Sequence, residues 1–406
     1  MTVTHRRLLL ALLITSGILN YADRQIIAVL KPLLQEQLHW SDSDYGHLTA
    51  LFQFAAAFAY LGAGWIVDRV GWRAANPLAV GTWSLAAMAH GMVHTLGQFS
   101  FARVALGATE SLGTPTAIKT IAALFTAKER SVALGAMNAA GNVGAIVTPL
   151  FVPVLALTWG WKSAFLVTGG VGLVWVAVWQ WAARSAVESP LQSASPPGAA
   201  REPVRWGTVL SDRRTWAIAG GKVLSDQVWW FLVFWMPDFF HRVFNLDMKS
   251  FAVPLAVVYS TAALGSLLGG FVSGRLISHG TDPISARFRT MLVCALLVTP
   301  VPLALFVANY WVAVALLSLA LAAHQGFSVN LFALTTDVTP ESRVGTVISV
   351  AALFGNLSGM AILQTAGWLL GSGYGFGPLF GLAAVAYLLA LAWIRTLLPK
   401  NAVAVN

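Results

Sequence analysis

Apolar runs of about twenty residues recur along the whole chain, and they constrain its fold more than any other feature. About twenty residues is the length that a helix needs to cross the hydrocarbon layer of a membrane. Only 10% of the residues are charged and 57% are hydrophobic, whereas the surface of a soluble domain requires roughly 25% charged residues. Lipid is therefore the expected surrounding of this chain, and we predict an all-α membrane protein.

The spacing of the apolar runs predicts twelve transmembrane helices. The first run contains Asp23 and Arg24 and is too long for a signal peptide, so we expect it to remain as the first helix of the mature protein. The approximate spans are 8–30, 46–67, 74–94, 98–125, 132–157, 162–183, 214–240, 252–276, 287–308, 311–335, 344–367 and 375–397.

A segment rich in proline, serine, glycine and charge separates the sixth span from the seventh. It contains Ser189-Pro190 and the run from Ala194 to Gly198, and such a composition without apolar periodicity is typical of a flexible linker. We therefore predict a six-helix bundle over 1–183, a cytoplasmic linker over 184–213 and a second six-helix bundle over 214–406. In two joined, pseudo-symmetric bundles of this kind, the substrate site is expected at the midplane between them.

The basic residues predict the orientation of the helices. If the spans alternate from a cytoplasmic N-terminus, 17 of the 25 lysines and arginines fall on the cytoplasmic side, 4 fall on the other side and 4 lie inside spans. Positive residues stay on the cytoplasmic side of a membrane, so both termini are expected to be cytoplasmic. The net charge of +9 thus reflects membrane topology and does not indicate a nucleic-acid partner.

A charged motif follows the second span. The residues from Gly64 to Arg73 read G-x-x-x-D-R-x-G-W-R, and this sequence resembles the loop signature of the major facilitator superfamily. Glycine permits a tight turn, and the charges can latch neighbouring helix ends in one conformation. We assign gating to Gly64, Asp68, Arg69, Gly71 and Arg73. A second, weaker copy over 270–275 lacks the aspartate, so the stronger latch is expected in the first half.

Charged residues inside the spans of the first half are the strongest functional candidates, because each costs about 2.5–3.5 kcal/mol to insert. Asp23 and Arg24 are sequence neighbours separated by about 100° of helix rotation, so they face different partners. Arg103 and Glu110 lie on nearly the same face of one helix, about 10 Å apart. Two alternatives stay open, a charge pair at a helix end and a structural network that joins the two helices.

The second half offers a different set of polar candidates. Lys222 and Asp226 are one helical turn apart, so they either neutralise each other or one of them faces a substrate. Trp230 offers a surface on which a sugar can stack. Uncharged donors and acceptors in apolar spans suit hydroxyl recognition or act as interhelical glue; these are Asn142, His324, Gln325, Asn330 and Asn356.

The resemblance becomes narrower on several segments. Tyr21-Ala22-Asp23-Arg24, Arg103 with Glu110, and the run 127–131 resemble the anion:cation symporter branch of the superfamily, and the runs 222–231 and 323–332 resemble its bacterial hexuronate transporters. The resemblance implies that Asp23 and Glu110 take part in proton coupling and that Arg24 engages the substrate carboxylate. Relatives commonly carry tyrosine where this chain has Ala56, and Tyr60 stands one turn later as a replacement.

We therefore expect a proton-coupled symporter that imports a hexuronate (glucuronate or galacturonate) or a similar sugar acid by alternating access. The alternatives are a transporter of another organic anion, such as an aldonate, an aromatic acid or a dicarboxylic acid, and an anion exporter. The predicted substrate-binding residues are Tyr21, Arg24, Arg103, Tyr60, Asn142, Lys222, Asp226, Trp230, His324, Gln325, Asn330 and Asn356.

Other classes of protein fit the sequence less well. No nucleophile motif or cluster of metal-ligating residues is present, so we expect neither an enzyme nor a metal site, and no cofactor. A receptor would need an added signalling segment. The expected partners are a small organic anion, protons and the lipid bilayer, with the chain acting as a monomer in a bacterial inner membrane.

Overall fold

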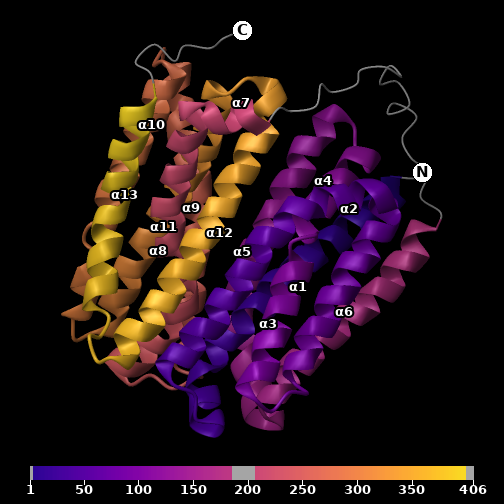
Figure 1. Cartoon of the computed structure of the whole chain (residues 1–406), viewed down its shortest axis with the longest axis vertical. Coiled ribbons are helices and arrows are strands. Elements are labelled where there is room, and N and C mark those ends of the chain that lie inside the picture. Colours follow the sequence, from indigo (N-terminus) through magenta and orange to yellow (C-terminus); the bar gives the residue numbers. More distant parts are fainter. Residues whose placement is uncertain (1–2, 185–205, 399–406) are drawn as a thin grey trace. The chain divides into compact units, whose positions relative to one another are not determined.

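The computed structural model describes residues 3–184 and 206–398, and within these ranges the chain is built from helices joined by short turns (Figure 1). The helices of the first half are α1 (Val3–Leu38), α2 (Asp42–His90), α3 (Leu96–Glu110), α4 (Gly113–Leu124), α5 (Ala127–Trp159) and α6 (Trp161–Ala183). Those of the second half are α7 (Trp206–Ser211), α8 (Arg213–Phe244), α9 (Ala252–Ser278), α10 (Pro283–Val298), the 3₁₀ helix η2 (Val301–Leu305), α11 (Tyr310–Val338), α12 (Glu341–Gly371) and α13 (Gly377–Leu397).

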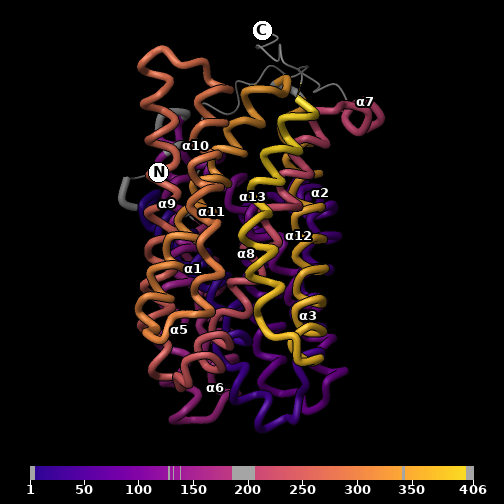
Figure 2. Tube along the Cα trace, turned by 90° about the vertical axis from the view of Figure 1, so that its left-hand side faces the viewer, coloured from indigo at the N-terminus to yellow at the C-terminus, as the bar shows by residue number. Residues whose placement is uncertain are grey.

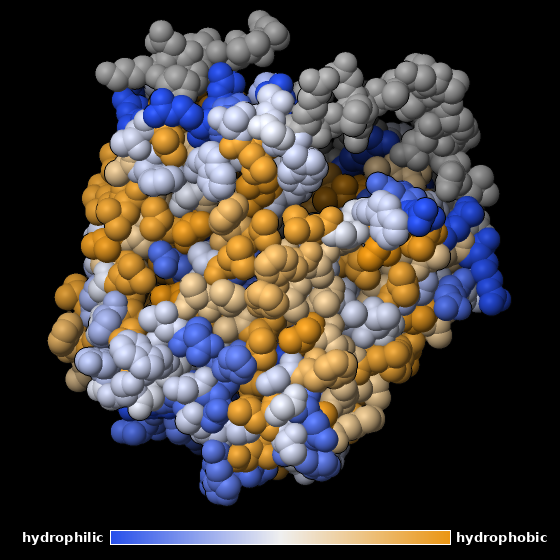
Figure 3. All heavy atoms as spheres, viewed as in Figure 1, coloured by the Kyte–Doolittle hydropathy of each residue, from blue (hydrophilic) through white to orange (hydrophobic). Residues whose placement is uncertain are grey.

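The surface of these helices is apolar along most of their length. In the described part of the chain, eight helical segments are long and apolar enough to cross a membrane by length and composition. Figure 3 shows hydrophobic side chains covering the middle of the helices and hydrophilic ones gathered toward their ends. This pattern is that of helices whose flanks face lipid and whose ends face water.

Helix α2 contains two predicted spans in one continuous run. The two arms meet at Gly71, which has φ 74° and ψ 157°. A positive φ of this size is unstrained only for glycine, so the motif glycine at this position makes the turn between the two spans. The predicted turn is therefore reduced to a kink at one residue.

The predicted span 98–125 is divided into α3 and α4. Ser111 and Leu112 separate the two helices. Pro115 has no backbone N–H and cannot donate to the carbonyl of Ser111, so the helical ladder is interrupted there. In the same way, the predicted span 287–308 ends as α10 at Val298 and continues as the short helix η2, because Pro302 cannot bond to the carbonyl of Val298.

The chain divides into two compact units. The N-terminal unit comprises Met1–Trp40 and Leu51–Ala200, and the C-terminal unit comprises Ser41–Ala50 and Arg201–Asn406. The first turns of α2 thus group with the C-terminal unit, although they precede the predicted boundary. Most of the predicted linker 184–213 lies outside the described residues, and its described part contains the short helix α7.

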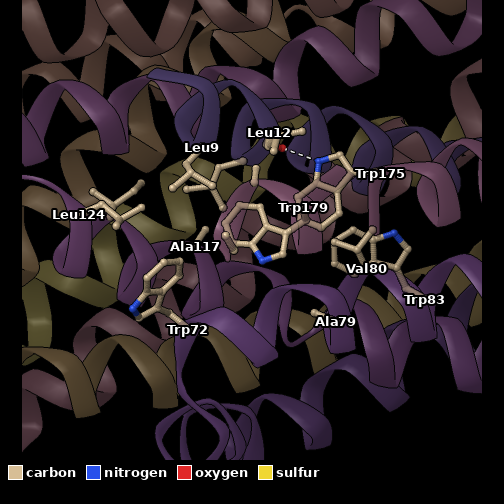
Figure 4. Packing of buried hydrophobic residues seen from close by; sticks show 14 of the residues in the cluster. Leu9, Leu12, Trp72, Ala79, Val80, Trp83, Ala117, Leu124, Trp175 and Trp179 are labelled. Carbon is tan, nitrogen blue, oxygen red and sulfur yellow. Dashed lines mark hydrogen bonds between the residues drawn. The ribbon is translucent and has the colours of Figure 1, made fainter. Parts of the chain in front are cut away.

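Stacked tryptophans form the core of the N-terminal unit (Figure 4). Trp175 and Trp179 of α6 stack with ring centroids 5.1 Å apart, and Trp179 meets Trp72 of α2 edge to face. Trp175 Nε1 donates to the carbonyl of Leu12 on α1 at 2.7 Å. A buried indole requires such a hydrogen-bond partner, so the tryptophans both fill the core and fix α6 against α1 and α2.

The C-terminal unit is built on two extensive helix pairs, α8 with α12 and α9 with α11, and Figure 2 shows α9 and α11 side by side. The segment Ser41–Ala50 is bound to this unit by specific contacts. Tyr45 donates to the carbonyl of Phe234 at 2.6 Å. Arg242, at the end of α8, pairs with both Asp42 and Asp238. Two buried carboxylates around one guanidinium hold the start of α2 in place.

Candidate functional site

An ion pair between Arg24 of α1 and Glu110 of α3 lies at the centre of the N-terminal unit. Arg24 donates from Nε and from Nη2 to the same oxygen of Glu110, at 3.1 and 2.9 Å. The Glu110 side chain is 1% exposed and that of Arg24 is 11% exposed. Glu110 Oε1 is buried and has no hydrogen-bond partner among the described residues. The guanidinium therefore uses one edge for Glu110 and keeps a small exposed surface.

Aromatic rings surround the arginines of this unit. The Arg24 guanidinium carbon lies 5.2 Å from the ring centroids of both Tyr21 and Phe52. The guanidinium carbon of Arg103, which is fully buried, lies 4.7 Å from the same Phe52 ring centroid. Such cation–π contacts stabilise a buried guanidinium without consuming its hydrogen-bond donors. Both guanidinium groups are thus stabilised in a setting from which water is largely excluded.

Asp23 takes a different direction from Arg24, as the helix rotation predicts. It is 1% exposed, and neither of its oxygens has a hydrogen-bond partner among the described residues. Thr168 of α6 lies beside it, but the threonine hydroxyl donates to the carbonyl of Ala164 at 3.0 Å. A buried carboxylate without partners carries a large desolvation cost when it is charged, which is the setting in which a carboxyl group takes up a proton.

The remaining predicted residues of the N-terminal unit are placed less specifically. Tyr60 is half-buried and lies close enough to act electrostatically on Arg24, whereas Ala56 is buried. Asn142 is half-buried, and its side chain has no hydrogen bond to the described part of the chain. Tyr60 is therefore brought near the ion pair, and Asn142 is not linked to it by any contact.

The charged motif that was predicted to gate transport lies around the kink of α2. Lys119 of α4 donates to the carboxylate of Asp68 at 2.8 Å and to the carbonyl of Val67 at 2.9 Å. Arg69 lies over the Trp65 ring at 4.7 Å, and the carbonyl of Arg73 accepts a hydrogen bond from Trp179 at 3.2 Å. Gly64 lies in open space. The motif thus ties the kink to α4 and α6.

An ion pair also lies inside the C-terminal unit. Lys222 and Asp226 are one turn apart on α8 and pair at 2.8 Å, with side chains 11% and 13% exposed. The Lys222 ammonium lies 4.8 Å from the Phe332 ring centroid. Gly355 of α12 approaches so closely that a Cβ there would meet Asp226 Oδ2 at 2.5 Å. The two charges neutralise each other, as one of the two sequence interpretations holds.

An uncharged network lies close to this pair. His324 Nδ1 of α11 and the Tyr387 hydroxyl of α13 are 2.7 Å apart, and that hydroxyl lies 3.4 Å from the carbonyl of Ser225. The His324 ring stacks on Trp229 at 5.0 Å. Sequence reasoning missed Tyr387, because a single tyrosine in an apolar span has no distinctive spacing. Three helices therefore hold this histidine in one orientation.

The other polar candidates of the C-terminal unit have structural contacts. Asn330 donates to the carbonyls of Gly269 and Gly326, at 3.0 and 2.8 Å, and so joins α11 to α9. Asn356 donates to the carbonyl of Ala352 in its own helix. Gln325 is half-buried without a hydrogen bond to the described residues, and Trp230 packs against the α12 backbone at Gly359. For Asn330, these contacts match the interhelical-glue alternative.

Two further ion pairs escaped the sequence reasoning. Arg6 of α1 forms a bidentate pair with Glu129 of α5, at 3.0 and 3.2 Å. Arg287 of α10 contacts Asp337 of α11 at 3.3 Å and Ser273 Oγ of α9 at 2.7 Å. Both lie at helix ends, where charge is common, so their spacing alone gives no signal. In the described ranges no group of three His, Cys, Asp or Glu side chains is placed to hold a metal ion.

Curated relatives are known over most of the chain. The hexuronate transporter of Escherichia coli K12 is 27% identical over 97% of this chain and 94% of its own length. The D-galactonate transporter of an uropathogenic Escherichia coli O6:H1 strain is 26% identical over 96% of this chain and 95% of its own. A probable L-galactonate transporter of Escherichia coli K12 is 30% identical, over 68% of this chain and 63% of its own length.

Solved structures and a family-wide match agree on the fold. A bacterial homologue of the human lysosomal transporter Spinster, in an inward-facing and occupied conformation, has a TM-score of 0.79 at 19% identity and covers 98% of this chain and 97% of its own. A D-xylose–proton symporter has a TM-score of 0.76 at 14% identity over 97% and 98% of the two chains. The fold is thus two pseudo-symmetric six-helix bundles, and the predicted fold class is confirmed. Because the Major Facilitator Superfamily matches residues 13–363, the chain belongs to that family of membrane transporters and is not an enzyme.

Proposed function

We propose that this protein is a proton-coupled symporter that imports a hexuronate or a similar sugar acid. The observation that carries the proposal is the buried ion pair between Arg24 and Glu110, which joins α1 to α3. A guanidinium binds a carboxylate through a planar fork of donors. An incoming substrate carboxylate therefore competes with Glu110 for the same cation.

This competition couples binding of the substrate anion to binding of a proton. When the substrate takes donors from Arg24, the buried Glu110 carboxylate loses the cation that is hydrogen-bonded to it. An unpaired buried carboxylate is costly, and proton uptake removes the charge. Substrate binding thus favours protonation of Glu110, and release of the substrate lets Arg24 pair with Glu110 again. This exchange is the coupling step that we propose.

Asp23 is the second proposed proton carrier. Its burial without a hydrogen-bond partner supports this role, and the charge of Glu110 acts on it electrostatically. Asp23 and Arg24 are adjacent on α1, so a change at one displaces the helix segment that carries the other. We assign Asp23 to the conformational change and Glu110 to the exchange with substrate.

The substrate class is proposed from the relatives. Proteins similar to this chain are named hexuronate, galacturonate and galactonate transporters. All of these anions carry a carboxylate, for which the buried Arg24 is a suitable partner, and several hydroxyls, which uncharged polar side chains can bind. We further propose that the chain acts as a monomer in a bacterial inner membrane with both termini in the cytoplasm, as its basic residues suggest.

The substrate-binding proposal also extends to other predicted residues, among them Asn142, Asn330 and Asn356. Tyr21 and Tyr60 lie close to Arg24, and Arg103 shares the Phe52 ring with it, so these three side chains shape the carboxylate end of the proposed site. Lys222, Asp226, Trp230 and His324 are proposed for the C-terminal unit, with Gln325 as a half-buried donor.

Uptake into proteoliposomes tests the proposal. The full-length protein should accumulate radiolabelled galacturonate, galactonate or glucarate against its gradient when the outside is acidic, and should only equilibrate it without a pH gradient. Glu110→Gln, which mimics the protonated carboxyl, should retain substrate binding and counterflow exchange but lose accumulation. Glu129→Gln serves as the matched control in the same unit and should still accumulate the anion, because it neutralises an ion-paired carboxylate that we assign neither to coupling nor to substrate binding.

Three results separate the parts of the proposal. If none of the three anions is transported, the substrate class is wrong. If an anion is transported without any response to pH, proton coupling is wrong. If Glu110→Gln still concentrates the anion on a proton gradient, coupling occurs but Glu110 does not carry it.

A further inference from the structure

His324 is held more rigidly than a side chain that only fills space in a helix bundle. Its ring is 5% exposed, stacks on Trp229 at an interplanar angle of 16°, and contacts the Tyr387 hydroxyl through Nδ1. Tyr387 is itself fully buried and packs edge to face on Phe327. The ring face is therefore fixed by α8, and Nδ1 and the ring edge are fixed by α13.

Counting protons in the network assigns the tautomer. The Tyr387 hydroxyl has one proton and two neighbours, His324 Nδ1 at 2.7 Å and the Ser225 carbonyl at 3.4 Å. If Nδ1 carries the imidazole proton, it donates to the phenol oxygen, and the phenol donates to the carbonyl. If instead the phenol donates to Nδ1, the Ser225 contact has no proton. Only the first arrangement uses both contacts, and it leaves Nε2 as an acceptor in the neutral ring.

The Nε2 acceptor of His324 lacks a donor within the network. Within the described residues no side chain or backbone group donates to it. The nearby Lys222 ammonium is already engaged by Asp226. A carboxylate gains nothing from an acceptor nitrogen, whereas a hydroxyl group donates to it.

We propose that His324 Nε2 accepts a hydrogen bond from a hydroxyl group of the transported anion, and that Tyr387 is the positioning residue that holds the required tautomer. This inference rests on the proposed function, because it takes the transported anion to be a sugar acid that carries hydroxyl groups. A site built to bond a hydroxyl rejects an analogue that lacks it. His324 therefore selects polyhydroxylated anions over simple carboxylates.

Binding to the purified full-length protein tests the inference. The probes are galacturonate, galactonate and glucarate; the one that binds most tightly is then compared with its analogues that each lack one hydroxyl. In the wild-type protein, one analogue should bind about tenfold more weakly than the parent, as expected for one lost hydrogen bond with an unsatisfied buried partner. His324→Leu should bind the parent about tenfold more weakly and no longer distinguish it from that analogue.

Further variants separate recognition from packing. His324→Gln keeps an acceptor oxygen and should recover part of the discrimination. Tyr387→Phe keeps the ring and should reduce the discrimination against the same analogue. Tyr259→Phe is the matched control, since its buried hydroxyl also lies 3.4 Å from a carbonyl of α8, that of Val233, and has no described contact with His324. It should leave the discrimination unchanged.

The outcomes that overturn the inference are distinct from those that overturn the proposed function. If the wild-type protein binds none of the three anions, the proposed function fails and the inference fails with it. If His324→Leu weakens every ligand equally and still discriminates against the same analogue, His324 has a structural role only. If Tyr387→Phe retains full discrimination while His324→Leu loses it, the positioning role of Tyr387 is wrong.

Discussion

The buried ion pair of the N-terminal unit joins two helices, whereas that of the C-terminal unit lies within one helix. Arg24 and Glu110 are 86 residues apart and bring α1 against α3, while Lys222 and Asp226 are four residues apart on α8. Breaking an interhelical pair releases one helix from another, but breaking a pair within a helix changes only the local charge. Ligand binding at the interhelical pair can therefore move one helix relative to another. Ligand binding at the pair within α8 can change only the local charge.

The helices pack in a similar way around the two ion pairs. The contrast between the pairs therefore comes from their polar side chains and not from the packing. In both units the first long helix packs against a later one, α1 against α5 and α8 against α12. Glycines permit both approaches: a Cβ at Gly144 would meet the Ile18 carbonyl at 2.6 Å, and one at Gly355 would meet Asp226. The two halves thus share a framework and differ in the polar groups placed on it.

The ion pairs at the helix ends also differ between the two units. Asp68 near the kink of α2 pairs with Lys119 of α4, whereas in the C-terminal unit Arg287 of α10 pairs with Asp337 of α11 and bonds Ser273. The second motif copy lacks the aspartate, but α11 supplies a carboxylate from a different position. Sequence comparison of the two copies therefore underestimates the contacts of the second one.

The largest effect is expected from replacing the two cations of the buried pairs. Arg24→Lys should weaken binding of the transported anion by about 10- to 100-fold, because an ammonium cannot reproduce the bidentate fork. Lys222→Arg should weaken it by only a few-fold, because the charge next to Asp226 is kept. Equilibrium binding to the purified protein measures both.

Arg24→Ala is a stricter test, since it removes the cation and with it the ion pair of Glu110. Near-wild-type affinity in Arg24→Ala would remove Arg24 from the binding site. Equal losses in Arg24→Lys and Lys222→Arg would contradict the assignment of the carboxylate to the N-terminal unit alone.

The next effect concerns the contacts at the helix ends. Asp68→Asn should slow transport by about tenfold and leave equilibrium binding nearly intact, because its contact with Lys119 stabilises a conformation and does not touch the substrate. Asp337→Asn should slow transport to a similar degree if Arg287 acts as the equivalent latch. Initial uptake rates and binding constants are measured on the same preparations. A loss of binding affinity in Asp68→Asn would argue against a latch, and unchanged transport in Asp337→Asn would confine the latch to the N-terminal unit.

Much of the fold follows from the sequence because the membrane imposes its length on the helices. The apolar runs predict the position of most long helices, although α1 continues to Leu38, beyond its predicted end at residue 30, and α2 joins two predicted spans with the motif glycine Gly71 at the kink. The break between α3 and α4 was not predicted, because a proline such as Pro115 is tolerated in many membrane helices. Its effect depends on whether neighbouring groups satisfy the freed carbonyl, which no local pattern reports.

The site was predictable in its residue types but not in its pairings. Charge inside a span identifies Asp23, Arg24, Arg103 and Glu110, and helix rotation separates Asp23 from Arg24. That Arg24 selects Glu110 depends on how α1 packs against α3, which is a tertiary property. The partner of His324 was missed for the same reason, since Tyr387 lies 63 residues away. The assigned roles remain predictions.

A smaller effect, on thermal stability, is expected from the glycines at the close helix contacts that the two units share. Gly144→Ala should lower the melting temperature by several degrees, because a methyl group there meets the backbone of α1 and overpacking costs about 1–3 kcal/mol. Gly355→Ala should cost less, because the atom that it meets is the end of the Asp226 side chain, which can rotate away. Thermal unfolding in detergent compares the two. Equal losses of stability would mean that Asp226 is held as rigidly as a backbone.

The smallest effect separates a titrating contact from a non-titrating one at the helix ends. Arg6 binds the Glu129 carboxylate, whereas Arg214 at the start of α8 donates to the backbone carbonyl of Val338 at 2.9 Å. Hydrogen bonds from the Thr126 amide and hydroxyl, with the Arg6 charge as a further cause, hold the pKa of Glu129 below its ordinary value of 4.5.

The sign of the pH dependence follows from that lowered pKa. A carboxyl whose pKa is lower in the folded state stabilises the protein fully above its unfolded pKa, and this stabilisation is lost as the pH falls through the folded pKa. Glu129→Gln should therefore lower the melting temperature by about 1–3 °C near pH 7, as for a surface ion pair, and this difference should disappear below about pH 4. Arg214→Gln should give a difference that does not change with pH, because a carbonyl does not titrate. If the deficit of Glu129→Gln persists in acid, it comes from lost packing or capping geometry, and the two helix ends are held by the same kind of contact after all.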